Sequence, residues 1–162
     1  MFDLFVRYKK VLIAIGIAFL ALSFILVLNK LNRNVLYEEL SLWIEDEKAL
    51  VLEVSDNPLE RQRGLSFRES LAIDAGMLFV FEKPDKHGIW MKDMNFPLDI
   101  IWLDENFKVV NFKKDVSPDT FPTAFTPSSP ALYVIETNTG FVDRFSIKIG
   151  EILDVRKESV EM

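Results

Sequence analysis

Residues 76–105 read GMLFVFEKPDKHGIWMKDMNFPLDIIWLDE and carry two dense apolar runs, two of the three tryptophans and the only histidine. Aromatic and β-branched residues fill 77–81, and both alternating faces of that run are apolar. This pattern predicts a strand that is covered on both sides. The polar, proline-containing segment 82–86 predicts a turn, and Ile89–Asp93 is expected to be the return strand of a central hairpin.

A second hairpin is expected directly after the first. Pro97 lacks a backbone donor and interrupts regular strand pairing. The apolar run 98–103 then predicts a strand, and the acidic segment 104–106 predicts a turn into a partner strand over 108–116.

The rest of the chain after residue 34 reads as further short elements joined by turns. Strands are predicted over 36–44, 49–54, 131–136 and 147–155, and short helices over 58–63 and 139–145. Asn57 is suited to cap the first helix, and Gly64 can take the left-handed conformation that ends it. Connections too short for crossovers favour antiparallel pairing. The sequence therefore predicts an all-β domain of seven or eight strands, a compact antiparallel β-sandwich or barrel with one or two short helices.

Residues 117–130 contain prolines at 118, 122, 127 and 130, together with Phe121 and Phe125. Such dense proline is incompatible with a strand ladder. A loop of this length is often a lid or a binding rim. The alternative is an ordered loop whose two phenylalanines cover the core.

The segment Val11–Leu28 contains no charged residue and is long enough, at about 1.5 Å per residue, to cross the roughly 30 Å hydrocarbon core of a bilayer. It exceeds the apolar region of an ordinary signal peptide, and no small-x-small cleavage site closes it. Three basic residues precede the segment and two follow it, which favours an N-terminus inside. We therefore expect residues 1–33 to be an uncleaved single-pass membrane anchor and residues 34–162 to be an extracytoplasmic β-domain.

Composition excludes several classes of function. From residue 34 onward the chain has 14 Lys and Arg against 24 Asp and Glu, a net charge of −10, which argues against nucleic-acid binding. The absence of cysteine excludes disulfides, thiolate metal sites and cysteine nucleophiles. With one histidine, no Asp-x-Asp-x-Asp-Gly loop and no Gly-x-Ser-x-Gly motif, the sequence predicts no metal, no cofactor and no assignable catalytic residue.

Lys92 is the most informative candidate for a binding site. On a strand it lies between core-type residues, so its amine needs a partner or must reach solvent. Asp99 and Glu136 interrupt otherwise apolar strands and are the expected partners. The cluster is then either a structural ion pair or a polar patch that orients a small ligand in an apolar pocket.

Three further residues complete the candidate binding set. Arg63 is either a solvated surface charge or a buried group that bonds loop carbonyls. Trp90 either packs in the core or stacks on a sugar ring. Asp93 and Asp99 are a possible glycosidase pair, but a proline break separates them and hides their spacing.

Five ordered motifs together resemble the domain of unknown function 192 family over roughly residues 50–155. They are ERQRGLSFR (60–68), GMLFVF (76–81), WMKD (90–93), PLDII (97–101) and VIE (134–136). The resemblance implies a compact all-β, jelly-roll-like domain that is often exported, and it implies no established activity.

Two classes of function follow from these features. The first is a membrane-tethered ligand-binding or interaction module of the cell envelope, which takes a small molecule, a glycan or a protein and touches the lipid bilayer through residues 11–28. The alternative is a cell-envelope hydrolase that uses a lysine and carboxylate site. A strongly perturbed carboxylate or lysine in a cleft favours the enzyme, and a shallow apolar groove without one favours binding.

Overall fold

The computed structural model describes residues 15–25 and 40–157 of the chain. Residues 15–25 form a helix with exposed side chains, within a unit that spans Met1–Glu38. None of the described helices is both long and apolar enough to cross a bilayer. The predicted span 11–28 extends outside the described residues at both ends, so the membrane anchor stays a prediction.

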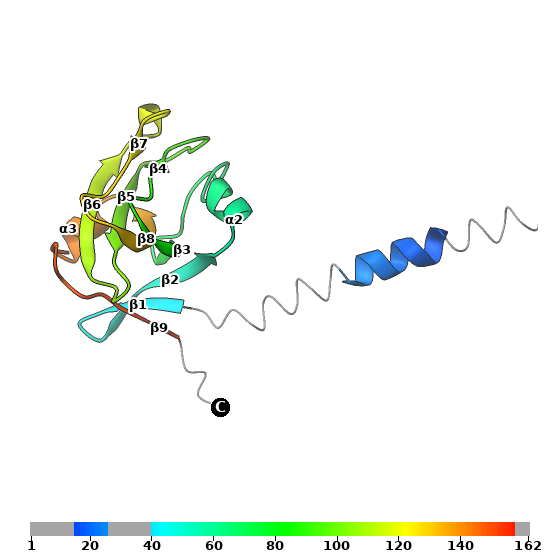
Figure 1. Cartoon of the computed structure of the whole chain (residues 1–162), viewed down its shortest axis with the longest axis horizontal. Helices are drawn as coiled ribbons and strands as arrows, with labels where there is room; N and C mark the ends of the chain where they lie inside the picture. Colours follow the sequence, from blue (N-terminus) through cyan, green and yellow to red (C-terminus); the bar gives the residue numbers. More distant parts are fainter. Residues whose placement is uncertain (1–14, 26–39, 158–162) are drawn as a thin grey trace, which may run out of the picture. The chain divides into compact units, whose positions relative to one another are not determined.

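The second unit, Glu39–Met162, is built mainly of strands (Figure 1). Its described elements are β1 (Leu40–Ile44), β2 (Glu47–Ser55), α2 (Pro58–Arg63), β3 (Ala75–Asp85), β4 (Ile89–Trp90), β5 (Leu98–Leu103), β6 (Val109–Val116), η1 (Pro118–Thr120), β7 (Ala124–Phe125), β8 (Ala131–Asn138), α3 (Phe141–Arg144) and β9 (Asp154–Lys157). The prediction of a mostly-β domain with short helices is confirmed, with nine described strands in place of seven or eight.

Seven strands form one sheet in the order β6-β5-β8-β3-β2-β1-β9. The prediction of purely antiparallel pairing is wrong at one place, because β2 and β3 run parallel from Val51↔Ala75 to Ser55↔Phe79. The chain between these two strands contains α2 and a long loop, which is enough length for a crossover. All other neighbours in the sheet are antiparallel.

The two ends of the sheet are linked by the chain that leads into β9. Lys108 and Ile152 form an antiparallel bridge, and the Val109 amide donates to the Glu151 carbonyl at 2.8 Å. These bonds stop before β9 begins, so the described strands do not close into a barrel.

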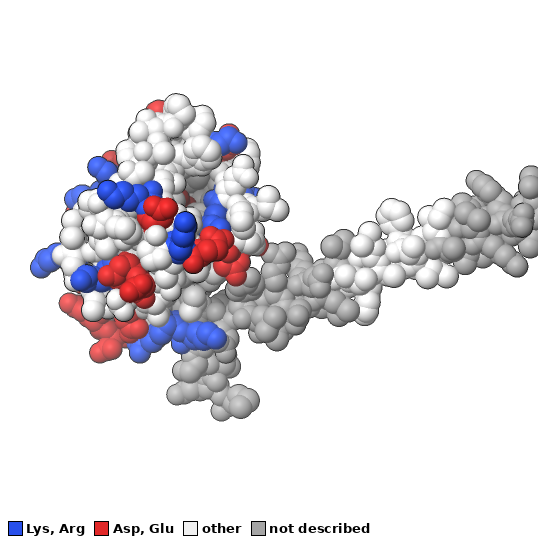
Figure 2. Space-filling view, in the orientation of Figure 1, with Lys and Arg blue, Asp and Glu red and all other residues white. Residues whose placement is uncertain are grey.

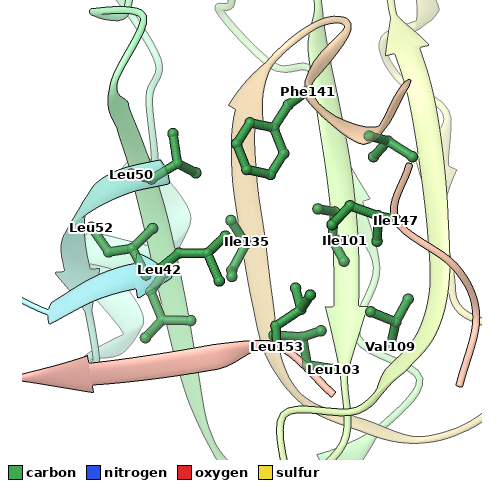
Figure 3. Packing of buried hydrophobic residues seen from close by; sticks show 12 residues of the cluster. Leu42, Leu50, Leu52, Ile101, Leu103, Val109, Ile135, Phe141, Ile147 and Leu153 are labelled. Carbon is green, nitrogen blue, oxygen red and sulfur yellow. The ribbon is translucent and has the colours of Figure 1, made fainter. Parts of the chain in front are cut away.

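Each face of the sheet carries its own core. The first core joins strands from both halves of the sheet with α3, and Figure 3 shows Leu42 and Leu50 on one side facing Ile135 and Phe141 on the other. The second core lies on the opposite face, around the fully buried Trp102, and α2, β4 and β7 belong to this side. Alternation along β5 separates the two, since Ile100 and Trp102 face the second core and Ile101 faces the first.

The predicted central hairpin is wrong in its pairing. Strand β3 continues to Asp85 and pairs with β2 and β8, whereas β4 is two residues long and pairs with β7. Asp93 has a φ of 55°, a left-handed conformation that is incompatible with a continuing strand. The segment expected to be a strand over 89–93 therefore ends at Trp90.

Other predictions have mixed outcomes. The hairpin of β5 and β6 is confirmed, and so is the helix at Pro58–Arg63, whose cap Asn57 accepts from the Glu60 amide at 3.0 Å. The loop 117–130 contains η1 and β7, and its Phe125 packs against the second core. The strand expected over 147–155 is wrong, because turns at Ser146 and Gly150 precede the short β9. Residues 36–39 of the first predicted strand lie outside the described residues.

Candidate functional site

A pocket of about 50 Å³ lies on the second-core side of the sheet, between the end of α2 and strands β3, β4 and β8. Its lining includes Arg63, Gly64, Ser66, Phe79, Trp90 and Glu136. Three of these six residues, Arg63, Trp90 and Glu136, are candidates from the sequence. The fold therefore brings half of the predicted binding residues together at this pocket.

The end of α2 shapes one wall of the pocket. Gly64 follows the helix with φ 50° and ψ −134°, a conformation that is open to glycine and costly for other residues. A Cβ at this position would lie 3.2 Å from Phe79 Cζ and 3.8 Å from Glu136 Oε2. The missing side chain therefore leaves room beside the Glu136 carboxyl group.

Glu136 lies on β8, between β5 and β3 near the centre of the sheet. Its directly opposite neighbours are Ile100 and Met77, both apolar, and only 5% of its surface is exposed. No hydrogen bond to its carboxyl group comes from the described residues. Burial raises the pKa of Glu136 from 4.5 to about 8, against the opposing effect of the Arg68 charge. The carboxyl group is therefore mostly protonated at neutral pH.

Two of the arginines near Glu136 form hydrogen bonds with other groups. Arg61 donates to the carbonyls of Asp56 and Val80, each at 2.7 Å, and to Glu82 at 2.6 Å. Arg68 donates to both carboxylate oxygens of Glu53 at 2.8 Å.

Arg63, by contrast, is exposed at the pocket lining, so the expectation of a solvated charge is confirmed over that of a buried one. No ion pair or hydrogen bond joins its guanidinium to another of the described residues.

Two hydrogen bonds fix the loop after α2 against the chain after β4. Ser66 Oγ donates to the Lys92 carbonyl at 2.8 Å, and the Phe67 amide donates to the Asp93 carbonyl at 2.8 Å. Trp90, immediately before this junction, is 45% exposed and packs edge-on against Phe121 with ring centroids 6.0 Å apart. The indole is thereby placed at the pocket rim and is not part of the core.

Charged side chains are unevenly distributed over the surface of the β-domain. Figure 2 shows charged side chains of both signs mixed over the lower part of the domain, while the upper part, where β7 lies in Figure 1, is mostly uncharged. Of the large apolar side chains that are exposed, Trp90 lines the pocket and Phe121 packs against Trp90, while Leu59 lies on α2 and Phe67 on the loop after it. A ligand at the pocket therefore meets the exposed indole of Trp90.

Lys92 does not pair with Asp99 or Glu136, and that prediction is wrong. Its side chain is 46% exposed, and its Nζ atom lies 3.5 Å from Oδ2 of the adjacent Asp93. Neither Lys92 nor Asp93 is among the residues that line the pocket. The predicted pairing depends on strand alternation through Lys92, but β4 ends at Trp90 and Asp93 has a left-handed backbone.

Asp99 has a structural environment on the other face of the sheet. It is fully buried, its Oδ1 accepts from the Asp115 amide and its Oδ2 accepts from the Val142 amide, both at 2.9 Å. These two bonds tie β6 and the start of α3 to the centre of the sheet. Of the six candidates, the pocket unites Arg63, Trp90 and Glu136 and leaves Lys92, Asp93 and Asp99 outside.

Sequence reasoning missed Gly64, Ser66 and Phe79 as pocket residues. The cap at Asn57 and the glycine after the helix mark the turn, but no local pattern places that turn beside a strand more than 70 residues later. Within the described part of the chain, no group of three or more His, Cys, Asp or Glu side chains is arranged to hold a metal ion.

Comparison with known proteins gives consistent matches for the domain. Residues 41–155 match the model of the DUF192 family, described as an uncharacterized ACR. A UPF0127 protein of Pyrococcus furiosus is 28% identical over 105 residues, which are 62% of this chain and 82% of the relative.

Two crystal structures share the fold, each with 28% identity and a TM-score of 0.65. One is a protein from Sinorhizobium meliloti 1021 described as a candidate transcription regulator, and it covers 73% of this chain and 92% of its own. The other is a protein of unknown function from Novosphingobium aromaticivorans, and it covers 72% of this chain and 83% of its own.

Proposed function

The chain belongs to the DUF192 family, whose description states no activity, and we propose that its domain is a ligand-binding module that recognises one end of a small molecule or polymer in the Glu136 pocket. The observation that carries this proposal is a nearly buried carboxyl group that receives no hydrogen bond from the described residues. Burying a polar group without a partner costs free energy, so folding alone does not favour it. A ligand that donates to Glu136 offsets that cost.

The size of the pocket limits what can enter it. One water needs roughly 10–15 Å³ of such space, so a pocket of about 50 Å³ holds a group of only a few heavy atoms. Whole drug-sized ligands occupy roughly 300–1,000 Å³. The proposed ligand therefore inserts one small terminal group, while the exposed indole of Trp90 contacts the rest of it.

We also propose that residues 11–28 hold the domain at a membrane, with the domain in the cell envelope and outside the cytoplasm. The uncharged apolar run supports this, as does the excess of basic residues before it. The Sinorhizobium meliloti protein is described as a candidate regulator of transcription, a role that commonly involves DNA binding. The net charge of −10 from residue 34 onward does not favour DNA binding, so we do not propose that role for this chain. The family resemblance implies a jelly-roll-like fold, and we propose that fold for the domain built on the seven-stranded sheet.

A hydrolase is the second candidate, and the raised pKa of Glu136 favours it. A carboxyl group that stays protonated at neutral pH is suited to act as a general acid. Glycoside hydrolysis also needs a second carboxylate at the same site, and Asp93 and Asp99 lie elsewhere. Binding therefore ranks first, and turnover is an outcome that the same experiment detects.

Thermal unfolding of the full chain in non-ionic detergent, against envelope glycans, peptides, amines and organic acids, tests the proposal. A ligand at 100 times its dissociation constant adds about 2.7 kcal/mol, which raises the midpoint by a few degrees. We expect a ligand to raise the unfolding midpoint of the wild type and not that of Glu136→Gln. Glu105→Gln is a matched change on the exposed 104–106 turn and should show the same rise as the wild type. Product formation that Glu136→Gln abolishes would identify the hydrolase. A panel without any shift would contradict the binding proposal.

A further inference from the structure

We propose that the group recognised in the Glu136 pocket is a primary ammonium at the end of an alkyl chain, bound as an ion pair with the ionised Glu136 carboxylate. This inference rests on the proposed binding function and names the class of its ligand. It follows from the donors, rings and charges around the carboxyl group.

Glu136 is 5% exposed, and its carboxyl group lacks a hydrogen-bond donor among the described residues, so a ligand that enters the pocket can supply the donor. An ammonium has three donors and no acceptor, which matches a carboxylate that offers only acceptors. Its positive charge also offsets the cost of ionising a carboxyl group in an apolar site.

The rings of Phe79 and Trp90 both line the pocket and give it apolar walls beside the Glu136 carboxyl group. Carbons next to an ammonium gain free energy by packing against such walls. The volume of about 50 Å³ accommodates an ammonium with the carbons next to it. The exposed indole of Trp90 then suits the rest of an alkyl chain.

Positive charges also surround the Glu136 carboxyl group. The charged groups that face Glu136 are Arg61 and Arg63 from α2 and Arg68 from the loop after it, while β3 and β5 contribute the apolar Met77, Phe79 and Ile100. Arg61 and Arg68 are paired with Glu82 and Glu53. Arg63 remains as an exposed cation that repels an ammonium or attracts an organic anion. Its removal therefore gives opposite results for the two ligand classes.

Three probes of matched size separate the classes: butylammonium, butanol and propionate. Each is titrated into the ¹⁵N-labelled full chain in non-ionic detergent, and amide shifts of Gly64, Phe79 and Trp90 report pocket occupancy. We expect butylammonium to bind at least tenfold more tightly than the other two. Its affinity should rise about tenfold from pH 6 to pH 7 and level off above pH 8, because binding requires ionised Glu136 and an alkylamine stays charged across this range.

Two variants with matched controls complete the test. Glu136→Gln should weaken butylammonium binding at least tenfold, and Glu105→Gln should leave it unchanged. Arg63→Ala should strengthen binding severalfold, because it removes a repelling charge, while Arg144→Ala, on the opposite face of the sheet, should have no effect. Arg63 is exposed, so this variant remains informative if the Glu136 variant fails to fold.

The source of the ammonium is decided by a fourth probe, a lysine blocked at both its amino and carboxyl ends. Tighter binding of the blocked lysine than of butylammonium assigns the pocket to a lysine side chain, and the reverse assigns it to a free alkylamine. The proposed ammonium ligand is wrong if propionate binds most tightly of the probes, loses affinity above pH 8 and binds less well to Arg63→Ala. In that case the proposed binding function still holds, with an organic anion as the ligand. Unchanged amide shifts with every probe would overturn both.

Discussion

Asp99 and Glu136 lie on the neighbouring strands β5 and β8, one residue out of register, and their carboxyl groups point to opposite faces of the sheet. The pairs are Asp99↔Thr137 and Ile100↔Glu136, so alternation places the two acids on different sides. Asp99 accepts two backbone hydrogen bonds, whereas Glu136 accepts none from the described residues. The Asp99 carboxylate therefore joins distant parts of the fold, and the Glu136 carboxyl group does not.

The first prediction is a loss of stability as the pH rises. The pKa of Glu136 is about 8 in the folded protein and near 4.5 when the chain unfolds. Between these values the folded state holds a proton that the unfolded state has lost, so the free energy of unfolding falls as pH rises and levels off above 8. The fall is on the order of 5 kcal/mol. Urea unfolding of the ligand-free chain at pH 5, 6.5 and 8.5 measures it.

The same titration has a matched control. Glu136→Gln has no ionisable group at this position, so we expect it to lose most of the fall, while Glu105→Gln retains it. If the free energy of unfolding of Glu136→Gln falls in parallel with that of the wild type, another group is responsible and Glu136 has an ordinary pKa.

The second prediction assigns Asp99 to stability. Asp99→Ala leaves the amides of Asp115 and Val142 without their acceptor and should lower the free energy of unfolding by about 2–4 kcal/mol. Asp99→Asn keeps one oxygen and should lose roughly half as much. Asp104→Ala is the matched control, because its carboxylate also accepts two amides but in an exposed turn where water replaces it. An equal loss in both variants would show that burial of Asp99 is not what matters.

Sequence reasoning identified most strands and the capped helix because their signals are local. The run 98–103 is apolar except for Asp99. Asn57, Pro58 and Gly64 mark a helix start and end within a few residues. These features depend on the chain immediately around them. Their residues appear in the structure close to where the pattern places them.

Strand partners and the pocket depend on contacts between distant segments, which local patterns do not encode. The pairing of β4 with β7 and the parallel pair of β2 and β3 are set by loop lengths and by burial across the whole sheet. The predicted pairing of Lys92 with Asp99 or Glu136 assumes strand alternation over residues 89–93, but β4 ends at Trp90 and Asp93 has a left-handed backbone. Glu136 was recognisable as an acid in an apolar strand, but its proximity to Gly64 was not.

The third prediction concerns the apolar run near the N-terminus. If residues 11–28 span a bilayer, the full chain stays in the membrane fraction after alkaline carbonate extraction, and a chain without residues 1–33 is released. Replacing both Leu20 and Leu22 by Arg should also release the chain, because arginine at the centre of a membrane helix costs about 2.5–3.5 kcal/mol. Extraction of the unmodified full chain by carbonate would contradict the anchor.

The fourth prediction separates backbone strain from pocket shape. Gly64 and Gly140 both have positive φ, at 50° and 87°, so alanine at either position should cost about 1–3 kcal/mol of stability. A Cβ at Gly64 would lie 3.2 Å from Phe79 and beside Glu136, whereas one at Gly140 would meet nothing within 4 Å. We therefore expect Gly64→Ala, and not Gly140→Ala, to weaken butylammonium binding in the amide-shift titration. Equal affinity in the two variants, with similar losses of stability, would show that ligands do not use the space beside Gly64.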